Sequence, residues 1–161
     1  MQHIFQCGYT KTAKGTEGIL DAYRAVFETD LIMSGPSEIS HVLRQAAARS
    51  KMFYKAPIAT TKSMQYCVLL ILTDGMVNDL ASTKELVQSY KRLNIPLSVI
   101  IVGIGRANFT EFHQWSKLSS DERGCFQFVE FREHQFDSDT LSRKALSKVP
   151  QEVVVLQASS L

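Results

Sequence analysis

The chain has 161 residues, 45% hydrophobic and 21% charged, and 18 basic against 16 acidic side chains leave a net charge of +2. This composition is typical of one soluble globular domain and lacks the clustered basic excess of a nucleic-acid binder. No run reaches the roughly 18 apolar residues of a membrane span, and the N-terminus lacks the pattern of a secretory signal. Three scattered cysteines, Cys7, Cys67 and Cys125, predict small buried hydrophobes in a reducing compartment, so we expect a cytoplasmic protein without a disulfide framework.

The first third of the chain predicts a short strand over residues 2–9 and then two helices. In the first helix, which Thr16 would cap, apolar side chains recur at helical spacing: Ile19, Leu20, Tyr23, Val26 and Phe27. The turn signal Ser-Gly-Pro-Ser at 34–37 opens the second helix. Its expected buried stripe is Ile39, Val42, Leu43 and Ala46.

The apolar pattern lapses over residues 50–65, which predicts a loop longer than is usual inside a compact domain. No acidic residue occurs between Glu38 and Asp74. That gap holds five basic residues: Arg44, Arg49, Lys51, Lys55 and Lys62. They are either a patch for an anionic partner or a solvated, variable segment.

A strand–helix–strand unit follows. Residues 66–72 are apolar without alternation, which predicts a parallel strand covered on both faces. Ser82 to Glu85 has the form of a capping box, and Asn94 with Pro96 ends the helix. The expected inner face of that helix is Leu86, Val87, Tyr90 and Leu93. Residues 97–102 predict a second doubly buried strand, and short joints make the unit a βαβ element.

The alternation continues to the C-terminus. Asn108 and Glu111 start a helix that carries Phe109, Phe112 and Trp115 as core residues, and a loop at 119–124 precedes a third strand at 126–131. Asp137 or Asp139 caps a last helix, which Pro150 kinks or restarts. Its apolar positions are Leu141, Ala145, Val149 and residues 153–156.

Candidate chemistry gathers where the strands end. In an open parallel sheet, ligands bind outside the carboxyl ends of the strands, and the apolar run ending at Leu72 delivers Asp74 there, followed by Gly75. Such a carboxylate can hold a hard divalent cation or cap the amides of the next loop, and a metal needs further oxygens to converge. Gly103 and Gly105 lack the third glycine and the later acidic residue of a dinucleotide fingerprint, so they predict a tight turn.

The four histidines, His3, His41, His113 and His134, are scattered through the sequence, and no pair has metal-ligand spacing. No Gly-x-Ser-x-Gly motif and no P-loop occurs. The sequence therefore offers no positive signal for nucleophilic catalysis, although a triad can assemble through space.

Several segments in order resemble the copine family, specifically its C-terminal von Willebrand factor A-like domain. The central ones are VLLILTDGMVNDLASTKELV, PLSVIIVGIGRANF and FQFVEFRE; the flanking ones are GTEGILDAYRAVF, SGPSEISHVLRQAAA and LSRKALSKVPQEVV. The likeness covers roughly residues 3–155. It implies a three-layer, doubly wound, mostly parallel α/β sheet.

The resemblance also implies a metal-ion-dependent adhesion site at the strand carboxyl ends. Asp74 matches its late Asp, and Ser37 lies where copines usually have a Thr ligand. The first ligand loop, Asp-x-Ser-x-Ser, does not occur in these residues. We therefore expect one partial A-like domain over residues 1–161 without its first strands, with residues 50–65 as an insertion and without the calcium- and phospholipid-binding domains that precede it in copines.

Two physical consequences follow from that expectation. A strand at 66–72 without its neighbour has an unpaired edge, which residues 2–8 or a partner chain would cover, so we expect self-association. With only Asp74 and Ser37 as protein ligands, Mg²⁺ or Ca²⁺ would bind weakly, and no resident cofactor is expected.

The function expected from the resemblance is a non-catalytic module that recruits other proteins. One alternative is a metal-assisted α/β hydrolase using Asp74 and Asp79, although Asp79 also suits the dipole of the following helix. Another is peripheral membrane attachment through the basic segment 44–62.

Overall fold

A computed structural model describes residues 4–10, 12–32, 37–54, 66–118 and 125–158, and the chain divides into two units, residues 1–36 and 37–161. The side chains of residues 53 and 54 are not described. Each unit is considered by itself.

In the first unit, helix α1 runs over Gly15–Val26 and follows the predicted apolar spacing, but none of its residues is buried. Tyr23 and Phe27 are each 60% exposed and meet edge to face at 5.2 Å between ring centroids. Two predictions are wrong here. Residues 4–9 form no strand, because Gly8 turns the chain with φ 74°, and the cap position of α1 is Lys14 rather than Thr16.

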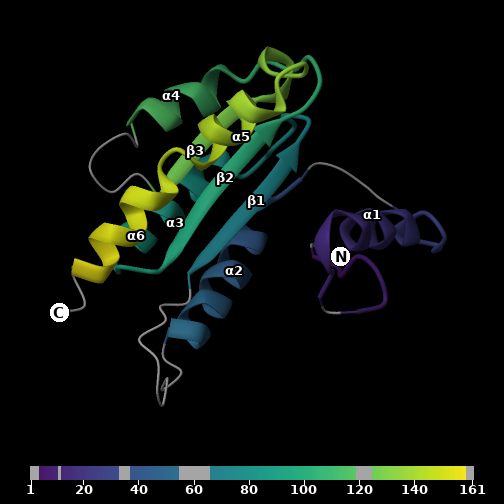
Figure 1. The fold of residues 1–161 in the computed structure, drawn as a ribbon, viewed down its shortest axis with the longest axis horizontal. Coiled ribbons are helices and arrows are strands. Elements are labelled where there is room, and N and C mark those ends of the chain that lie inside the picture. Colours follow the sequence, from purple (N-terminus) through teal and green to yellow (C-terminus); the bar gives the residue numbers. More distant parts are fainter. Residues whose placement is uncertain (1–3, 11, 33–36, 55–65, 119–124, 159–161) are drawn as a thin grey trace. The chain divides into compact units, whose positions relative to one another are not determined.

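The second unit is built on a parallel sheet with strand order β1–β2–β3 (Figure 1). β1 is Cys67–Thr73, β2 is Leu97–Gly103 and β3 is Phe126–Glu130. β1 and β2 pair in register from Cys67 with Leu97 to Thr73 with Gly103. The three predicted strands are therefore present, and all point the same way, so their carboxyl ends share one edge.

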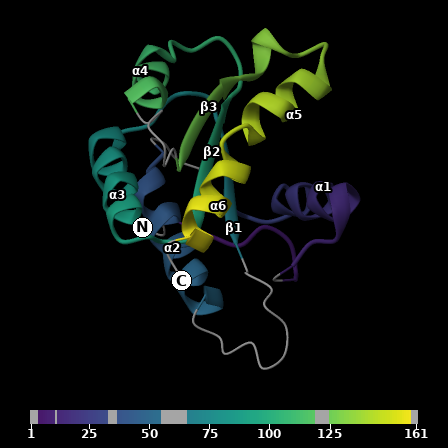
Figure 2. The same ribbon diagram turned by 60° about the vertical axis from the view of Figure 1, so that its left-hand side comes forward.

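Helices cover both faces of this sheet, which is the expected doubly wound α/β arrangement. Figure 2 shows α2 (Ile39–Tyr54), α3 (Leu80–Arg92) and α4 (Thr110–Leu118) on one side of the sheet. On the other side lie α5 (Ser138–Leu146) and α6 (Val149–Ala158). A short 3-10 turn, η1 (Phe131–Glu133), joins β3 to the segment before α5.

The core fills the space between the sheet and α2, α3 and α4. Its most buried members include Leu43, Ile101 and Phe126. Trp115 of α4 stacks on Phe126, with 3.6 Å between ring centroids, so the prediction of Trp115 as core is confirmed.

Phe109 lies just before α4 and packs under the ends of β1 and β2. A Cβ atom added at Gly103 would lie 2.8 Å from the Phe109 ring, and one at Gly75 would lie 2.9 Å from it. Gly75 also has φ 96°, a conformation that L side chains rarely adopt. Both positions therefore need glycine for close packing against Phe109.

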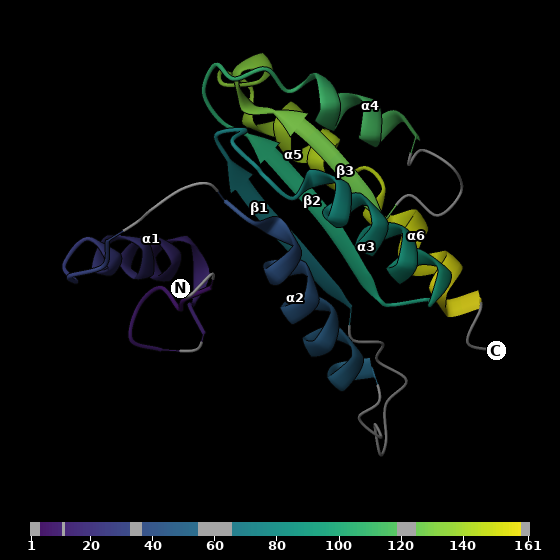
Figure 3. The ribbon, with the colours of Figure 1, turned by 180° about the vertical axis from the view of Figure 1, so that it is seen from behind.

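β1 corrects the prediction of a strand covered on both faces. Leu69 and Ile71 pack against the core, and Figure 3 shows α2 alongside β1 from behind. The alternate side chains, Val68, Leu70 and Leu72, are 42%, 57% and 61% exposed. The physical reason is position: β1 is at the edge of the sheet, and α5 packs on β2 and β3. We call Val68, Leu70 and Leu72 the β1 stripe.

Several helix boundaries differ from the prediction. α3 begins at Leu80, so Ser82 lies inside its first turn and no capping box forms. Leu93, predicted to face inward, is 64% exposed at the end of α3. α2 continues to Tyr54, so only residues 55–65 of the predicted loop lie outside the described residues.

The C-terminal helices follow the sequence closely. Asp137 caps α5, because its Oδ1 accepts a hydrogen bond of 2.9 Å from the Thr140 amide. Pro150 is the second residue of α6, where its missing N–H costs nothing, so it restarts the helix.

Candidate functional site

The carboxyl end of β1 carries the two residues predicted to bind a cation. Asp74 is exposed, and its Oδ1 accepts a hydrogen bond of 3.1 Å from the Met76 amide within the same turn. Ser37 forms an isolated parallel bridge with Val77, and its carbonyl accepts a 3.2 Å bond from the Asn78 amide. The segment of Ser37 thus runs beside the loop that follows Asp74, at the predicted edge of the sheet.

A small hollow of about 190 Å³ opens at the same edge. It is lined by Gly75, Val77, Leu80, Asn108, Thr110, Glu111 and Phe112. Its polar groups are partly committed, since Asn108 Oδ1 accepts from both the amide and the hydroxyl of Thr110 at 3.0 and 2.6 Å. The hollow is therefore an open polar depression at the sheet edge rather than an enclosed active-site pocket.

Asp79 acts on a different helix from the one that the sequence suggested. It occupies the cap position of α3 but makes no side-chain bond there. Its Oδ1 and Oδ2 instead accept hydrogen bonds of 2.9 and 2.8 Å from the amides of Ile39 and Ser40, which begin α2. Burial would raise the Asp79 pKa, but the bonds from the Ser40 side chain and from these amides lower it overall.

This arrangement bears on the hydrolase alternative, which needed Asp74 and Asp79 together. Both carboxylate oxygens of Asp79 are committed to the N-terminus of α2, where a negative charge is favourable. Burial also raises the pKa of the Cys67 thiol, an effect that Arg49 only partly opposes. Cys67 therefore lacks the low thiol pKa that activates a cysteine nucleophile.

The remaining cysteines divide by environment. Cys125 is buried, as predicted, whereas Cys7 is exposed in the first unit, which corrects the expectation for that residue. Of the basic segment, Arg44, Arg49 and Lys51 are exposed on α2, and Lys55 and Lys62 lie outside the described residues.

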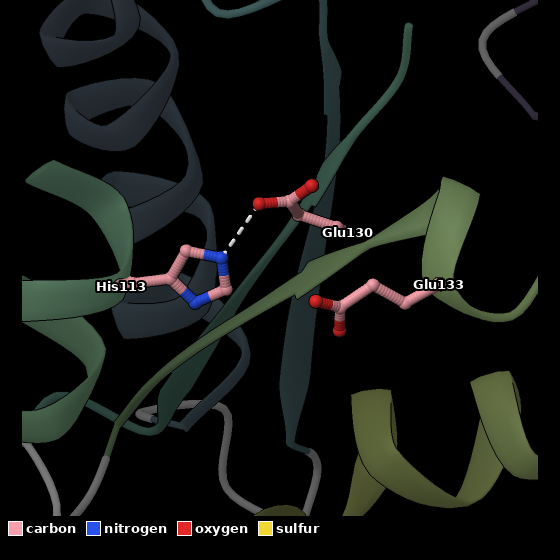
Figure 4. Close-up of side chains that lie close together, drawn as sticks. All are labelled: His113, Glu130 and Glu133. Carbon is pink, nitrogen blue, oxygen red and sulfur yellow. Dashed lines mark hydrogen bonds and ion pairs between the residues drawn. The ribbon is translucent and has the colours of Figure 1, made fainter. Parts of the chain in front are cut away.

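A cluster that sequence spacing did not reveal lies at the carboxyl end of β3. His113 of α4 and Glu130 of β3 hydrogen-bond through Nε2 and Oε1 at 2.7 Å, and Glu133 of η1 points toward the same space (Figure 4). Candidate ligand atoms of the three side chains lie within 4.8 Å of one another. The available signal in the sequence was Glu130, an acidic residue at the end of a mostly apolar strand.

The sequence itself decides the family. The Copine family profile matches residues 3–160. The chain belongs to the copine family. It is 31% identical over 166 residues to Copine-B of Dictyostelium discoideum and 30% identical over 165 residues to Copine-E of the same organism. Each comparison covers 94% of this chain but only 29% and 27% of those relatives, so the chain spans less than a third of their length.

Copine membership agrees with the parallel sheet and its two helical layers, which is the fold expected of the family's A domain. Among the described residues, no helix of this copine chain is long and apolar enough to cross a membrane. Coordination of a cation by Asp74 and Ser37 stays a prediction.

Proposed function

We propose that this copine chain is a non-catalytic protein-interaction module. We further propose that it associates through β1 and that the partner at β1 is a second copy of the chain. The observation that carries the proposal is the β1 stripe. Three apolar side chains stand 42–61% exposed in a row on an edge strand. Exposed apolar surface beside an open strand edge marks a site of association.

The backbone of β1 supports a strand-to-strand contact. Within the part of the chain that the structure describes, β1 pairs with β2 alone, so its other edge is free to accept a strand. An antiparallel pair centred on Leu70 would set Val68 of each copy opposite Leu72 of the other. The alternation of side chains then puts all six apolar groups on one face.

The chemistry of the strand favours a second copy as the occupant. Residues 67–73, CVLLILT, contain no charged side chain, so a symmetric pair brings no like charges together. The same stretch is complementary to itself, as an isologous contact requires.

The non-catalytic part of the proposal rests on the edge residues described above. Asp79 is used as a cap, and the Cys67 thiol has a raised pKa. We also propose that Asp74 and Ser37 form an incomplete adhesion site, because they are the only two predicted metal ligands in this sequence. Two protein oxygens leave most of the coordination of Mg²⁺ or Ca²⁺ to water, so affinity is weak.

Sedimentation equilibrium of the full chain over a range of concentrations tests the association. We expect a monomer–dimer equilibrium that Leu70→Lys shifts to monomer. Burying the half-exposed Leu70 is worth about 1 kcal/mol per copy, so its loss weakens the dimer by about 30-fold, before the repulsion between two ammonium groups is added.

Leu93→Lys is the matched control, because Leu93 is 64% exposed but lies at the end of α3. It should leave the equilibrium unchanged, and circular dichroism should show both variants folded. A wild-type chain that stays monomeric at high concentration, or a dimer that Leu70→Lys does not weaken, would refute association through β1.

A further inference from the structure

The described residues place an imidazole and two carboxylates in one small space at the carboxyl end of β3, on the same edge of the sheet as Asp74 but two strands along. His113 Nε2 lies 2.7 Å from Glu130 Oε1, and the potential ligand atoms of His113, Glu130 and Glu133 are all within 4.8 Å of one another. Figure 4 shows the side chains converging from α4, β3 and η1. Because three separate elements supply them, their meeting is a product of the fold.

Two of the three side chains are held in place. The Glu130 side chain is 6% exposed, and the His113 ring packs edge to face on Phe128 with 4.9 Å between centroids. Glu133 is 51% exposed and can move. The site thus has one buried donor, a second that packs on Phe128, and a third with more freedom to move.

The electrostatics of the cluster favour a cation. Arg132 Nε lies 2.5 Å from Glu130 Oε2, so one guanidinium faces two carboxylates and the cluster has a net charge of minus one when its histidines are neutral. Glu130 Oε2 is itself buried, and Arg132 is its ion-pair partner. A buried carboxylate close to a second one is costly unless positive charge is added.

An independent observation points to the same space. His134, directly after η1, has a side chain only 10% exposed, and its Nε2 is buried without a hydrogen bond among the described residues. That nitrogen lies 3.9 Å from Glu133 Oε2. Metal-bound carboxylates are usually oriented by such a neighbouring donor, and a small movement of Glu133 would complete the bond.

We propose that His113, Glu130 and Glu133 bind one divalent transition-metal ion, with Zn²⁺ as the best match, and that His134 orients Glu133. One nitrogen and two carboxylate oxygens suit Zn²⁺, whereas Mg²⁺ and Ca²⁺ prefer oxygen ligands alone. Tetrahedral ligands at about 2.1 Å from zinc lie about 3.4 Å from one another. Binding therefore needs His113 Nε2 and Glu130 Oε1 to separate by about 0.7 Å, which the 38% exposed His113 side chain allows. It also needs the widest gap to close by up to about 1.4 Å, within reach of the half-exposed Glu133.

Competition with a chromophoric zinc chelator tests the proposal on the full chain in a Cys7→Ser background, because an exposed thiol such as Cys7 can itself bind zinc. We expect one Zn²⁺ per chain with micromolar or tighter affinity. Glu133→Gln, which changes a half-exposed side chain, should weaken binding by about 100-fold or more, since even the loss of an orienting neighbour costs 10–100-fold.

The matched control is His41→Gln. His41 and Glu38 form another imidazole–carboxylate pair at 2.9 Å, but they belong to no three-ligand cluster within the described residues. This variant should bind zinc like the parent. A Co²⁺ spectrum without a thiolate charge-transfer band is expected, because nitrogen and oxygen ligands give no such band.

Three results would overturn the site. These are millimolar or weaker zinc binding, equal affinity in Glu133→Gln and the parent, and a thiolate band in the Co²⁺ spectrum. The outcome does not depend on the β1 contact, because these side chains come from α4, β3 and η1 and the association experiment needs no metal.

Discussion

Replacing Asp79 should loosen the start of α2. In Asp79→Ala, the amides of Ile39 and Ser40 lose both acceptors. These two residues are only 4% and 5% exposed, so water cannot readily replace the carboxylate. Losing a helix cap costs about 0.5–2 kcal/mol and leaving a buried donor unpaired about 1–3 kcal/mol, so we expect a loss of about 2–3 kcal/mol in the free energy of unfolding.

The assay is urea denaturation at neutral pH, supported by thermal melting, in which this loss corresponds to a Tm decrease of roughly 4–12 °C. Asp79→Asn keeps one acceptor oxygen and should lose only about 1 kcal/mol. Asp74→Asn is the control, because Asp74 accepts only from Met76 in its own turn and the amide oxygen can keep that bond.

The pH dependence provides a second check. The folded pKa of Asp79 is lowered, so its stabilising effect is present above the unfolded pKa of about 3.9 and disappears as pH falls through the folded value. The difference between wild type and Asp79→Asn should therefore shrink below about pH 4. If Asp79→Ala stays within about 0.5 kcal/mol of wild type at neutral pH, as ordinary surface changes do, the capping argument is wrong.

Other substitutions test the sheet edge and the last helices. Gly75→Ala should cost about 2–4 kcal/mol in urea unfolding, from its positive φ and its clash with Ala107 and Phe109. Gly105→Ala, with φ 90° but open space, should cost clearly less, and equal costs would contradict the packing argument. Asp137→Ala should lower the Tm and Asp137→Ser should restore part of it; an unchanged Tm would show that the α5 cap is not needed. Calorimetric titration should show no micromolar Mg²⁺ or Ca²⁺ binding; such binding, lost in Asp74→Ala, would contradict the incomplete adhesion site.

Local patterns predicted the elements of the second unit well. The apolar runs at 66–72 and 97–102 are strands. Asp137 caps α5 and Pro150 lies in the first turn of α6, as predicted from their side chains. Such signals depend on residues near in sequence, and the fold did not override them.

The predictions that failed or were missed depend on which segments, distant in sequence, pack against a helix or strand. The run at 66–72 predicted two covered faces, but coverage depends on which helix packs there, and the β1 stripe is exposed. Asp79 was expected to favour the dipole of the helix that follows it and does stand at the start of α3, yet the amides that its side chain binds are about 40 residues away in sequence. The cluster of His113, Glu130 and Glu133 was invisible for the same reason, since its members meet only when α4 packs beside β3.

The position of Phe109 makes three sites interdependent. One benzene ring fills the room that a methyl group at residue 75 or at residue 103 would occupy. The three atoms nearest to a methyl group at residue 103 all belong to that ring, so Phe109→Leu should partly rescue Gly103→Ala, whereas at residue 75 the Ala107 side chain also stands in the way. The loops that follow β1 and β2 therefore share one packing space with the residue before α4. A larger side chain in one of these segments restricts the side chains that the other two can accept.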